Sequence, residues 1–286
     1  ARQASGTHQI NGLETPHTLQ MRVVTFNSST AAMQAVQEGV AEFTFMSSDE
    51  VSAAVNGRDM YSEMKLSDLR LVARVFPFKV GIVVREDSGI RSIEDLRGKR
   101  FPVGWQGFPQ GKYLSRALLA TGGLTEDDIE GVPISNLIRG ADDLKSGRLD
   151  ATMFAIGAPK MAELDAALGG IHFINLTNSE EARARMAEIR PEYQIASQPA
   201  APYLHGVEDG AFLMQYATTV AAHKDVAPEL VAKIAETLHN QKKALVAGHP
   251  SFGALVPEGL ATPQPGVSYH PGAEAYYREI GIWPEN

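Results

Sequence analysis

One pattern occurs twice in the chain, as MQAVQEGVAEFTF at residues 33–45 and as DDLKSGRLDATMF at residues 142–154. Each copy has a helix-forming segment, a glycine that ends the helix, and an immediate run of strand-forming residues. Two lobes built on one plan would produce this repetition, although α/β proteins also repeat such units by chance. The pattern indicates an α/β fold and favours two lobes.

Strands and helices are expected to alternate around the two copies. The run Val80–Val84 has no charged residue, which is typical of a strand buried on both faces. Alternation of such strands with helices predicts, in each lobe, a mixed and mostly parallel sheet flanked by helices, with a ligand cleft between the lobes. We expect strands at residues 21–26, 40–46, 69–75, 79–85, 100–104 and 212–222. We expect helices at residues 30–37, 49–56, 92–99, 112–120, 228–246 and 273–280.

The composition is that of a folded, acidic protein. The chain has 286 residues, about twice the usual size of one domain, with 44% hydrophobic and 21% charged residues. Its formal net charge of -8 disfavours nucleic acid and anionic membrane surfaces as partners. The absence of cysteine excludes disulfides, thiol catalysis and thiolate metal sites.

Neither a membrane span nor a leader is evident in the sequence. Apolar runs stay well below the roughly 20 residues that cross a bilayer. The chain starts at Ala1, and Ala1–Gln3 lacks the basic and apolar character of an export signal. We expect that an upstream segment has been removed.

Several phrases of the sequence resemble the solute receptors of TRAP transporters of the TAXI type, which have the type II periplasmic binding-protein fold. The similarity extends over residues 21–281, and its C-terminal phrase is the most distinctive. The phrases are Asn27–Ser29, Gly39–Asp49, Asp87–Ile90, Asp95–Lys99, Ser146–Ala151, Gly157–Pro159 and His270–Glu279.

The resemblance implies a monomeric periplasmic receptor, without a metal or cofactor and without enzymatic turnover. Such a receptor captures a small carboxylate, a glutamate-like amino acid or another organic acid, by hinge closure and delivers it to TRAP membrane subunits. Chain crossings expected near Asp87 and within residues 200–210 give lobe 1 at residues 1–87 plus 206–286 and lobe 2 at residues 88–205.

The N-terminus departs from the family pattern. Similar receptors begin with a strand and a Gly-rich loop that enters the cleft, whereas here a polar stretch at residues 1–17 precedes what resembles the second family strand. Either the first strand is missing from this chain or lobe 1 is built differently.

Loops that follow strands are the predicted binding site. In open α/β sheets, ligands bind outside the carboxyl ends of strands, where loops lead into helices. Free backbone N–H groups and the helix dipole attract a carboxylate there. Hydroxyl and amide side chains add donors, although they can equally serve as helix caps, and the two roles can coexist. The predicted polar contacts are Asn27, Ser28, Ser29, Ser47, Ser48 and Gln106.

Apolar and basic residues complete the predicted site. Phe78, Trp105 and Phe108 could form walls for the carbon skeleton of a ligand, although such rings also pack in cores, and Gly107 permits close approach. Gly157 and Met161 lie in a further candidate loop. An acidic ligand would also welcome one positive charge, for which the candidates are Arg139, Lys79, Lys112 and Lys160.

Motifs for catalysis are missing from the sequence. The eight histidines lack paired metal-site spacing, and no Gly-x-Ser-x-Gly elbow, Walker loop or dinucleotide fingerprint occurs. An ABC-type receptor of the same fold is the main alternative. The sensing domain of a regulator and an enzyme on this fold are less favoured.

Overall fold

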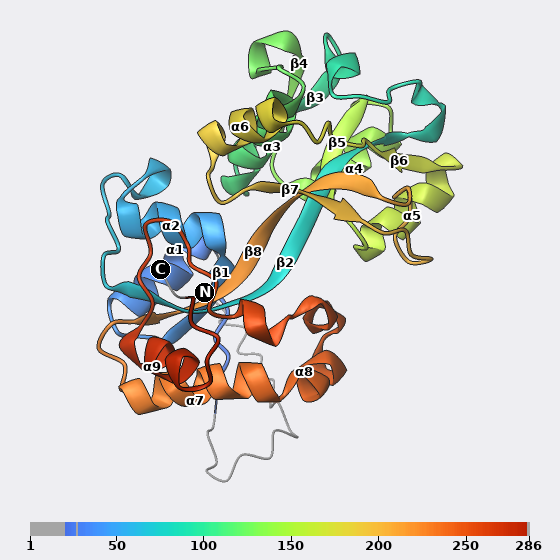
Figure 1. Cartoon of the computed structure of the whole chain (residues 1–286). Coiled ribbons are helices and arrows are strands. Elements are labelled where there is room, and N and C mark those ends of the chain that lie inside the picture. The colour runs from blue at the N-terminus through green and yellow to red at the C-terminus, as the bar shows by residue number, and fades with distance from the viewer. Residues whose placement is uncertain (1–20, 27, 285–286) are drawn as a thin grey trace. The chain divides into compact units, whose positions relative to one another are not determined.

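The computed structural model describes residues 21–26 and 28–284, which divide into two compact units (Figure 1). Unit 1 is formed by the chain up to Pro77 and from Ala217 onward, and unit 2 by Phe78–Tyr216. Both boundaries fall inside long strands, so β2 (Leu69–Arg85) and β8 (Ala211–His223) each belong to both units. The lobe boundaries expected from the sequence stay a prediction.

Unit 1 surrounds its parts of β2 and β8 with helices. The helix expected at residues 228–246 is two helices, because the chain breaks at Gln241 between α7 and α8. The helices α1, α2 and α9 and the strand β1 agree with their expected positions to within a few residues, whereas the 3-10 helices η1, η5 and η6 were not predicted. The elements are α1 (Ser29–Gln37), β1 (Phe43–Ser47), α2 (Ser48–Asn56), η1 (Asp59–Tyr61), α7 (Pro228–Asn240), α8 (Lys242–Gly248), η5 (Pro250–Ala254), η6 (Pro257–Gly259) and α9 (Pro271–Glu279).

The C-terminal helix α9 lies beside α7 and closes the core of unit 1 (Figure 1). A Cβ added at Gly272 would lie 2.1 Å from the Pro228 carbonyl oxygen, so only glycine allows this approach. The buried Tyr277 hydroxyl donates to the Val72 carbonyl of β2 over 3.0 Å. The two sequence segments that form unit 1 are therefore joined in one core.

Unit 2 has shorter strands connected by helices. The segment at residues 92–99, expected as a helix of one or two turns, has a single 3-10 turn, and the Ser92 hydroxyl accepts from the Asp95 N–H over 3.4 Å. Strand β3 has the expected bounds. The elements are η2 (Glu86–Ser88), η3 (Glu94–Leu96), β3 (Arg100–Gly104), α3 (Gln110–Thr121), η4 (Glu126–Asp128), β4 (Glu130–Ile134), α4 (Leu137–Lys145), β5 (Ala151–Ala155), α5 (Pro159–Leu168), β6 (Ile171–Phe173), α6 (Glu180–Ile189) and β7 (Gln194–Gln198).

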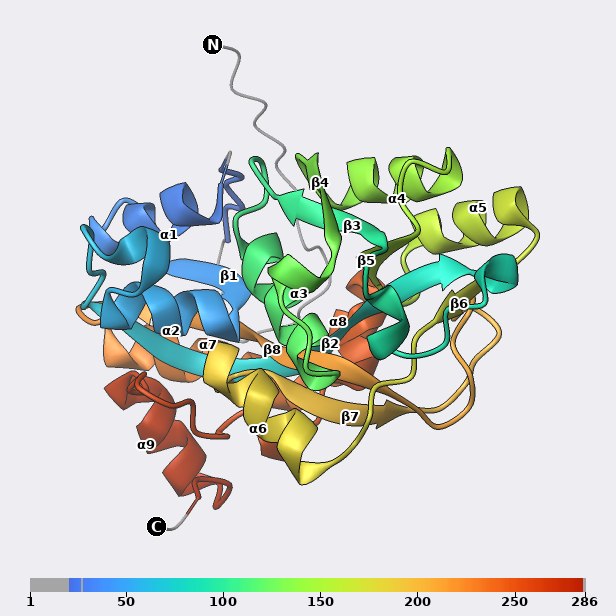
Figure 2. The ribbon, with the colours of Figure 1, turned by 90° about the horizontal axis from the view of Figure 1, so that it is seen from above.

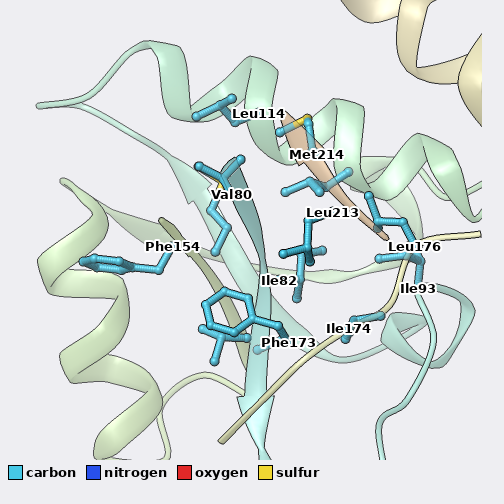
Figure 3. Packing of buried hydrophobic residues seen from close by; sticks show 14 of the residues in the cluster. Val80, Ile82, Ile93, Leu114, Phe154, Phe173, Ile174, Leu176, Leu213 and Met214 are labelled. Atoms are coloured by element: carbon cyan, nitrogen blue, oxygen red, sulfur yellow. The ribbon is translucent and has the colours of Figure 1, made fainter. Parts of the chain in front are cut away.

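The core of unit 2 is built around the second half of β2 (Figure 3). All of residues Val80–Val84 are buried, and the packing at Gly81 is so close that an added Cβ would lie 2.9 Å from the Phe173 ring and 3.0 Å from Leu213. Each fully buried aliphatic side chain such as Ile82 contributes about 1.5–3 kcal/mol. The expected strand with two buried faces is confirmed.

The prediction of mostly parallel sheets is wrong. β1 pairs with β8, β2 with β5 and with β6, and β7 with β8, all antiparallel. β3 and β4 are parallel. A helix between two strands permits either direction in a sheet, and a buried run looks the same in both, so the sequence pattern did not encode the pairing.

Three of the expected strands differ in the structure. Residues 69–75 and 79–85 form one continuous strand, in which Pro77 and Phe78 lie at an exposed position that tolerates proline. Residues 21–26 are exposed and form no strand, because no described strand pairs with them. Residues 1–17, expected as a frayed helix remnant or a loop, lie outside the described residues, and so does the question of a first strand.

Candidate functional site

Three strands of unit 2 end at the same edge. β3 and β4 run side by side with Gly104 opposite Ile134 (Figure 2). β5 starts beside the start of β3, because the Asp150 N–H donates to the Arg100 carbonyl over 3.0 Å and the Asp150 carboxylate binds the Arg100 guanidinium. All three strands lead from this edge into the N-termini of α3, α4 and α5 through the unit 2 loops, which are residues 105–109, 135–136 and 156–158.

The loop after β3 has a strained backbone. Gly104 and Trp105 have φ angles of 87° and 51°, in the left-handed region that residues other than glycine rarely adopt. The Gly107 N–H donates to the Ser135 carbonyl over 2.9 Å and ties this loop to the loop after β4. Strain of this kind is concentrated at functional sites, which makes the loop a candidate.

The Trp105 ring lies in the core beneath this loop. Only 1% of the residue is exposed, and a Cβ added at Gly111 would lie 2.4 Å from the ring, so the first turn of α3 rests on the indole. Phe108 packs against it with ring centroids 6.2 Å apart. The buried indole N–H has no hydrogen-bond partner among the described residues, which is unusual for a native core. Trp105 supports the loop, and its contact with a ligand stays a prediction.

The remaining predicted contacts in unit 2 differ in exposure. Gln106 is exposed, and Phe78 is 37% exposed with its ring 5.6 Å from that of Tyr216. Gly157 has a φ of 70° and lies against Leu204. Met161 is fully buried, so a ligand would reach it only after neighbouring side chains moved.

Most of the candidate cations in unit 2 already have partners. The Arg139 guanidinium lies 2.8 Å from Asp143, and the Lys160 ammonium binds Asp142 and Glu163 at 2.8 and 2.9 Å. The Lys79 ammonium donates to the Ser197 carbonyl over 2.7 Å, and partial burial lowers its pKa.

Lys112 differs from these three cations. It is exposed in the first turn of α3 and forms no ion pair with any residue that the structure describes. A cation is disfavoured beside the positive end of a helix dipole, so an anion bound nearby would offset that cost.

In unit 1, two helix N-termini meet at one carboxylate. Ser29 at the start of α1 donates its hydroxyl to Glu50 Oε1 over 2.6 Å, and Ser47, before α2, donates to Glu50 Oε2 over 3.1 Å. Glu50 is 9% exposed, and burial raises its pKa. The structure thus brings together two predicted contacts, and we call residues 28–30 and 47–50 the unit 1 loops.

The other hydroxyls predicted in unit 1 have backbone partners. Ser28 caps α1 by accepting from the Ala31 N–H over 3.2 Å. Ser48 is buried, and its hydroxyl accepts from the Ala217 N–H over 3.2 Å. Asn27 lies outside the described residues. Ser28 therefore caps its helix. Its contact with a ligand stays a prediction.

Neither a metal site nor a membrane span is found in the described part of the chain. Within residues 21–26 and 28–284, no cluster of three or more His, Asp or Glu side chains is arranged to hold a metal ion. Over the same ranges, none of the helices has the length and apolar character needed to cross a bilayer.

The profile of the NMT1-like family matches residues 6–281. This chain belongs to the NMT1-like family. Solved structures with 15% identity include the periplasmic aliphatic sulphonate binding protein SsuA of Escherichia coli, with a TM-score of 0.47 over 91% of this chain and 72% of that one. The alkanesulfonate-binding protein SsuA of Xanthomonas axonopodis pv. citri, bound to MOPS, has a TM-score of 0.48 over 91% and 82%. The L-arginine-bound AbpA of Streptococcus pneumoniae, an amino acid ABC transporter substrate-binding protein, has a TM-score of 0.42 over 78% and 72%.

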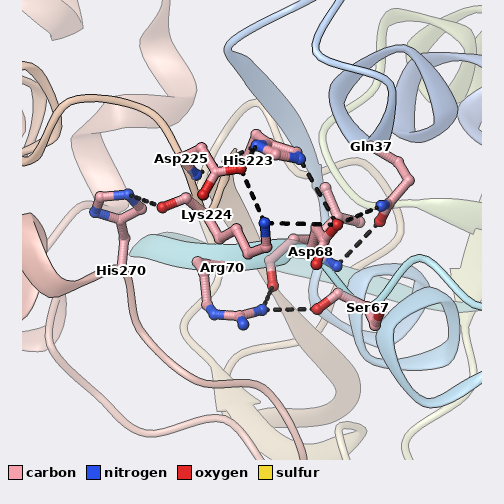
Figure 4. A network of polar contacts seen from close by, with 9 residues as sticks. Gln37, Ser67, Asp68, Arg70, His223, Lys224, Asp225 and His270 are labelled. Carbon is pink, nitrogen blue, oxygen red and sulfur yellow. Dashed lines mark hydrogen bonds and ion pairs between the residues drawn. The ribbon is translucent and has the colours of Figure 1, made fainter.

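The most distinctive phrase of this NMT1-like chain, residues 270–279, serves the core of unit 1. The His270 ring is buried at the start of α9, where it accepts from the Gly272 N–H over 3.1 Å and lies 3.2 Å from the Lys224 carbonyl (Figure 4). Burial lowers the pKa of His270. A surface network around Asp68, which the Lys224 ammonium, His223 and Gln37 contact, continues from this point.

Sequence reasoning missed Glu50 in this NMT1-like protein. A signal was present, because Ser47-Ser48-Asp49-Glu50 fits the S-x-x-E pattern that marks a helix N-terminus. The pattern predicts local capping, but here the Glu50 carboxylate accepts from the Ser47 hydroxyl and from Ser29 on another helix. The contact with Ser29 spans 21 residues and could not be read from local spacing.

Proposed function

We propose that this protein is an extracytoplasmic solute-binding receptor that captures a small carboxylate and delivers it to the membrane subunits of a TRAP transporter. The ligand is a glutamate-like amino acid or another organic acid, and binding closes the two units as a hinge. Membership of the NMT1-like family and the TAXI-like phrases of the sequence support this proposal.

The observation that carries the proposal is the edge of unit 2 where β3, β4 and β5 end. Three helices, α3, α4 and α5, begin there, and the first backbone N–H groups of a helix lack partners within it. Helix N-termini of this kind can bind a carboxylate through these free N–H groups and the helix dipole. The exposed Lys112 ammonium adds a full positive charge at the same edge.

The strands that cross the unit boundary support the hinge. β2 and β8 pass from one unit to the other, and hinges are a few residues that absorb changes in backbone angles. Pro77 and Phe78 on β2, and Tyr216 and Ala217 on β8, flank the boundary. A ligand that stabilises the closed form would shift the population toward it.

The direct test is mass spectrometry of ligand that co-purifies with the protein, followed by a thermal-shift screen of metabolites. A bound acid should raise the melting temperature, since a ligand at one hundred times its Kd stabilises by roughly 2.7 kcal/mol. No stabilisation by any acid or amino acid would contradict the ligand class, and turnover of a hit would contradict a receptor.

A matched pair of variants tests whether Lys112 supplies the positive charge of the binding site. Lys112→Gln should weaken binding of the acid by about threefold to tenfold, or about 0.7–1.4 kcal/mol, in isothermal titration calorimetry. Lys99→Gln removes an equally exposed charge just before β3, at the opposite end of the strand, and should change the affinity by less than twofold. If the two substitutions change the affinity for the acid equally, Lys112 is not part of the binding site.

A further inference from the structure

The two units repeat each other at a fixed offset of 108 positions. Subtracting 108 from the bounds of β4, α4 and β5 gives residues 22–26 and the bounds of α1 and β1. Ser28 and Asn136, whose side chains cap α1 and α4, are 108 positions apart. So are Gly39 and Gly147, which follow these helices with φ angles of 68° and 75°. A shared plan over a run of successive elements is the mark of an internal repeat, so each position in this part of unit 1 has a counterpart in unit 2.

β3 and α3 have no counterpart in the part of unit 1 that the structure describes. β4 starts at Glu130, 30 residues after β3 starts at Arg100, so residues 1–20 are too few to repeat the whole segment. In unit 2, β3 pairs with β4 and also lies beside β5, since the Arg100 N–H donates to the Asp150 carboxylate over 2.8 Å. The same place in unit 1 is the outer edge of β1, which pairs with no strand among the described residues. A free strand edge is a template for pairing with another segment.

Two apolar side chains that are exposed in unit 1 have buried counterparts in unit 2. Phe45 on β1 is 49% exposed, whereas Met153, 108 positions later on β5, is 1% exposed. Helix α3 covers Met153, because the Ser115 hydroxyl lies 3.8 Å from its sulfur. Phe26 is 37% exposed, and its counterpart Ile134 on β4 is 4% exposed. Unit 1 therefore leaves open an apolar surface of the kind that β3 and α3 help to bury in unit 2.

We propose that the open edge of β1 binds a polypeptide segment of the β3–α3 kind, a short apolar strand parallel to β1 that is followed by a helix. Addition of a strand to a sheet edge gains affinity from main-chain hydrogen bonds and specificity from alternate side chains. The helix of the segment covers Phe45 as α3 covers Met153, and its strand gives residues 22–26 a partner. The inference goes beyond the proposed function, because it adds a polypeptide partner and does not depend on which solute is bound.

The test is hydrogen–deuterium exchange of the full chain, with a synthetic peptide of residues 100–121 of this chain as the probe. Without the peptide, amides of residues 22–26 and of the outer edge of β1 should exchange about tenfold faster than those of β4 and β5. A saturating concentration of the peptide should slow residues 22–26 and β1 by about tenfold and leave β4 and β5 unchanged. A peptide of residues 110–121 contains the helix without the strand, and it should have no effect.

Two variants with a new charge locate the binding edge. Phe45→Lys places a charge on the edge strand and should abolish the effect of the longer peptide. Val256→Lys changes an apolar residue of unit 1 that is 58% exposed and should retain the effect. Circular dichroism checks that both variants fold, and the two peptides decide the question on the unchanged chain if one does not.

Three results would overturn the inference. The first is slow exchange at β1 without peptide, which means that the edge is already covered, by residues 1–20 in a monomer or by a second copy in a dimer; analytical ultracentrifugation distinguishes these two. The second is fast exchange that the longer peptide does not slow. The third is equal slowing by both peptides, which means that the strand is not what binds. None of these results bears on solute binding, so the proposed function is tested separately.

Discussion

The unit 1 loops and the unit 2 loops share one plan but differ in what holds them together. In both, strands or extended segments lead into helix N-termini. The unit 2 loops are held by packing and backbone contacts, with Gly111 against the Trp105 ring and Gly107 bonded to Ser135, and Lys112 keeps its charge available. The unit 1 loops are held by the Glu50 carboxylate, which consumes two hydroxyl protons. The same local architecture is therefore held in two ways, by packing and backbone contacts in unit 2 and by a buried carboxylate in unit 1.

The largest effect is expected where packing holds the unit 2 loops. Gly111→Ala places a methyl group 2.4 Å from the Trp105 ring, so either the first turn of α3 or the indole must move. Overpacking of this kind lowers the free energy of unfolding by about 1–3 kcal/mol, measured by urea denaturation. Gly248→Ala, where a Cβ meets nothing within 4 Å, is the control. A neutral Gly111→Ala would show that packing does not hold the loop.

The second-largest effect is expected at Arg139, a candidate ligand-binding cation that pairs with Asp143. Arg139→Gln leaves the buried Asp143 carboxylate with Arg148 at 3.8 Å. The free energy of unfolding should fall by about 1–2 kcal/mol, while ligand affinity stays within twofold. Arg185→Gln, which breaks an exposed pair of the same spacing with Glu181, should cost at most about 0.5 kcal/mol. A large loss of affinity would instead make Arg139 a second ligand-binding cation.

The charge of Glu50 should make the stability of unit 1 depend on pH. Burial and the nearby Asp49 raise the pKa of Glu50 above its ordinary value, while Ser29 and Ser47 lower it. A raised folded-state pKa means that the group contributes stability at low pH, which is lost as pH rises through that pKa. Tyr61, which faces the same cluster, titrates far above this range.

Glu50→Gln should therefore match the wild type in melting temperature near pH 4 and exceed it at pH 7, by roughly 2–4 °C for about 1 kcal/mol. Differential scanning calorimetry across pH 4–8 measures the gap. If Glu50→Gln instead becomes less stable than the wild type as pH rises, the hydrogen bonds of the carboxylate stabilise the unit 1 loops by more than its burial destabilises them.

The smallest effect separates capping from ligand contact at Ser28. Ser28→Asp keeps an acceptor for the Ala31 N–H and should change stability by only about a few tenths of a kcal/mol, whereas Ser28→Ala should cost about 0.5–1 kcal/mol. If Ser28 only caps α1, the Asp variant retains ligand affinity. A tenfold loss in the Asp variant without a loss of stability would assign Ser28 a ligand contact.

Local chemistry explains what the sequence could and could not predict. β3 at residues 100–104 follows from neighbouring residues alone, and its bounds are confirmed. The antiparallel pairing of β2 with β5 joins Val84 to Ala151, and no local pattern records the direction of such a pair. The bounds of β3 were therefore predictable from local sequence, whereas strand pairing was not.

The candidate site shows the same limit. The rule about strand ends selected Trp105 and Ser29 by position, but the contacts of their side chains depend on how the chain folds back on itself. Gly111 buries the indole after a turn that the sequence does not reveal, and Glu50 reaches Ser29 from the next helix. The sequence indicated which side chains can donate a hydrogen bond. It did not indicate which acceptor already receives that hydrogen bond in the folded protein.

The hydrogen bond between Tyr277 and Val72 has a consequence for the order in which the molecule forms. The two residues are 205 positions apart, and all of unit 2 lies between them. As the chain emerges from a ribosome or an export channel, unit 2 is complete long before α9 arrives, and domains generally fold as units in the order of their synthesis. The N-terminal part of unit 1 therefore stays incomplete until α9 has been made and the Tyr277 hydroxyl can reach Val72.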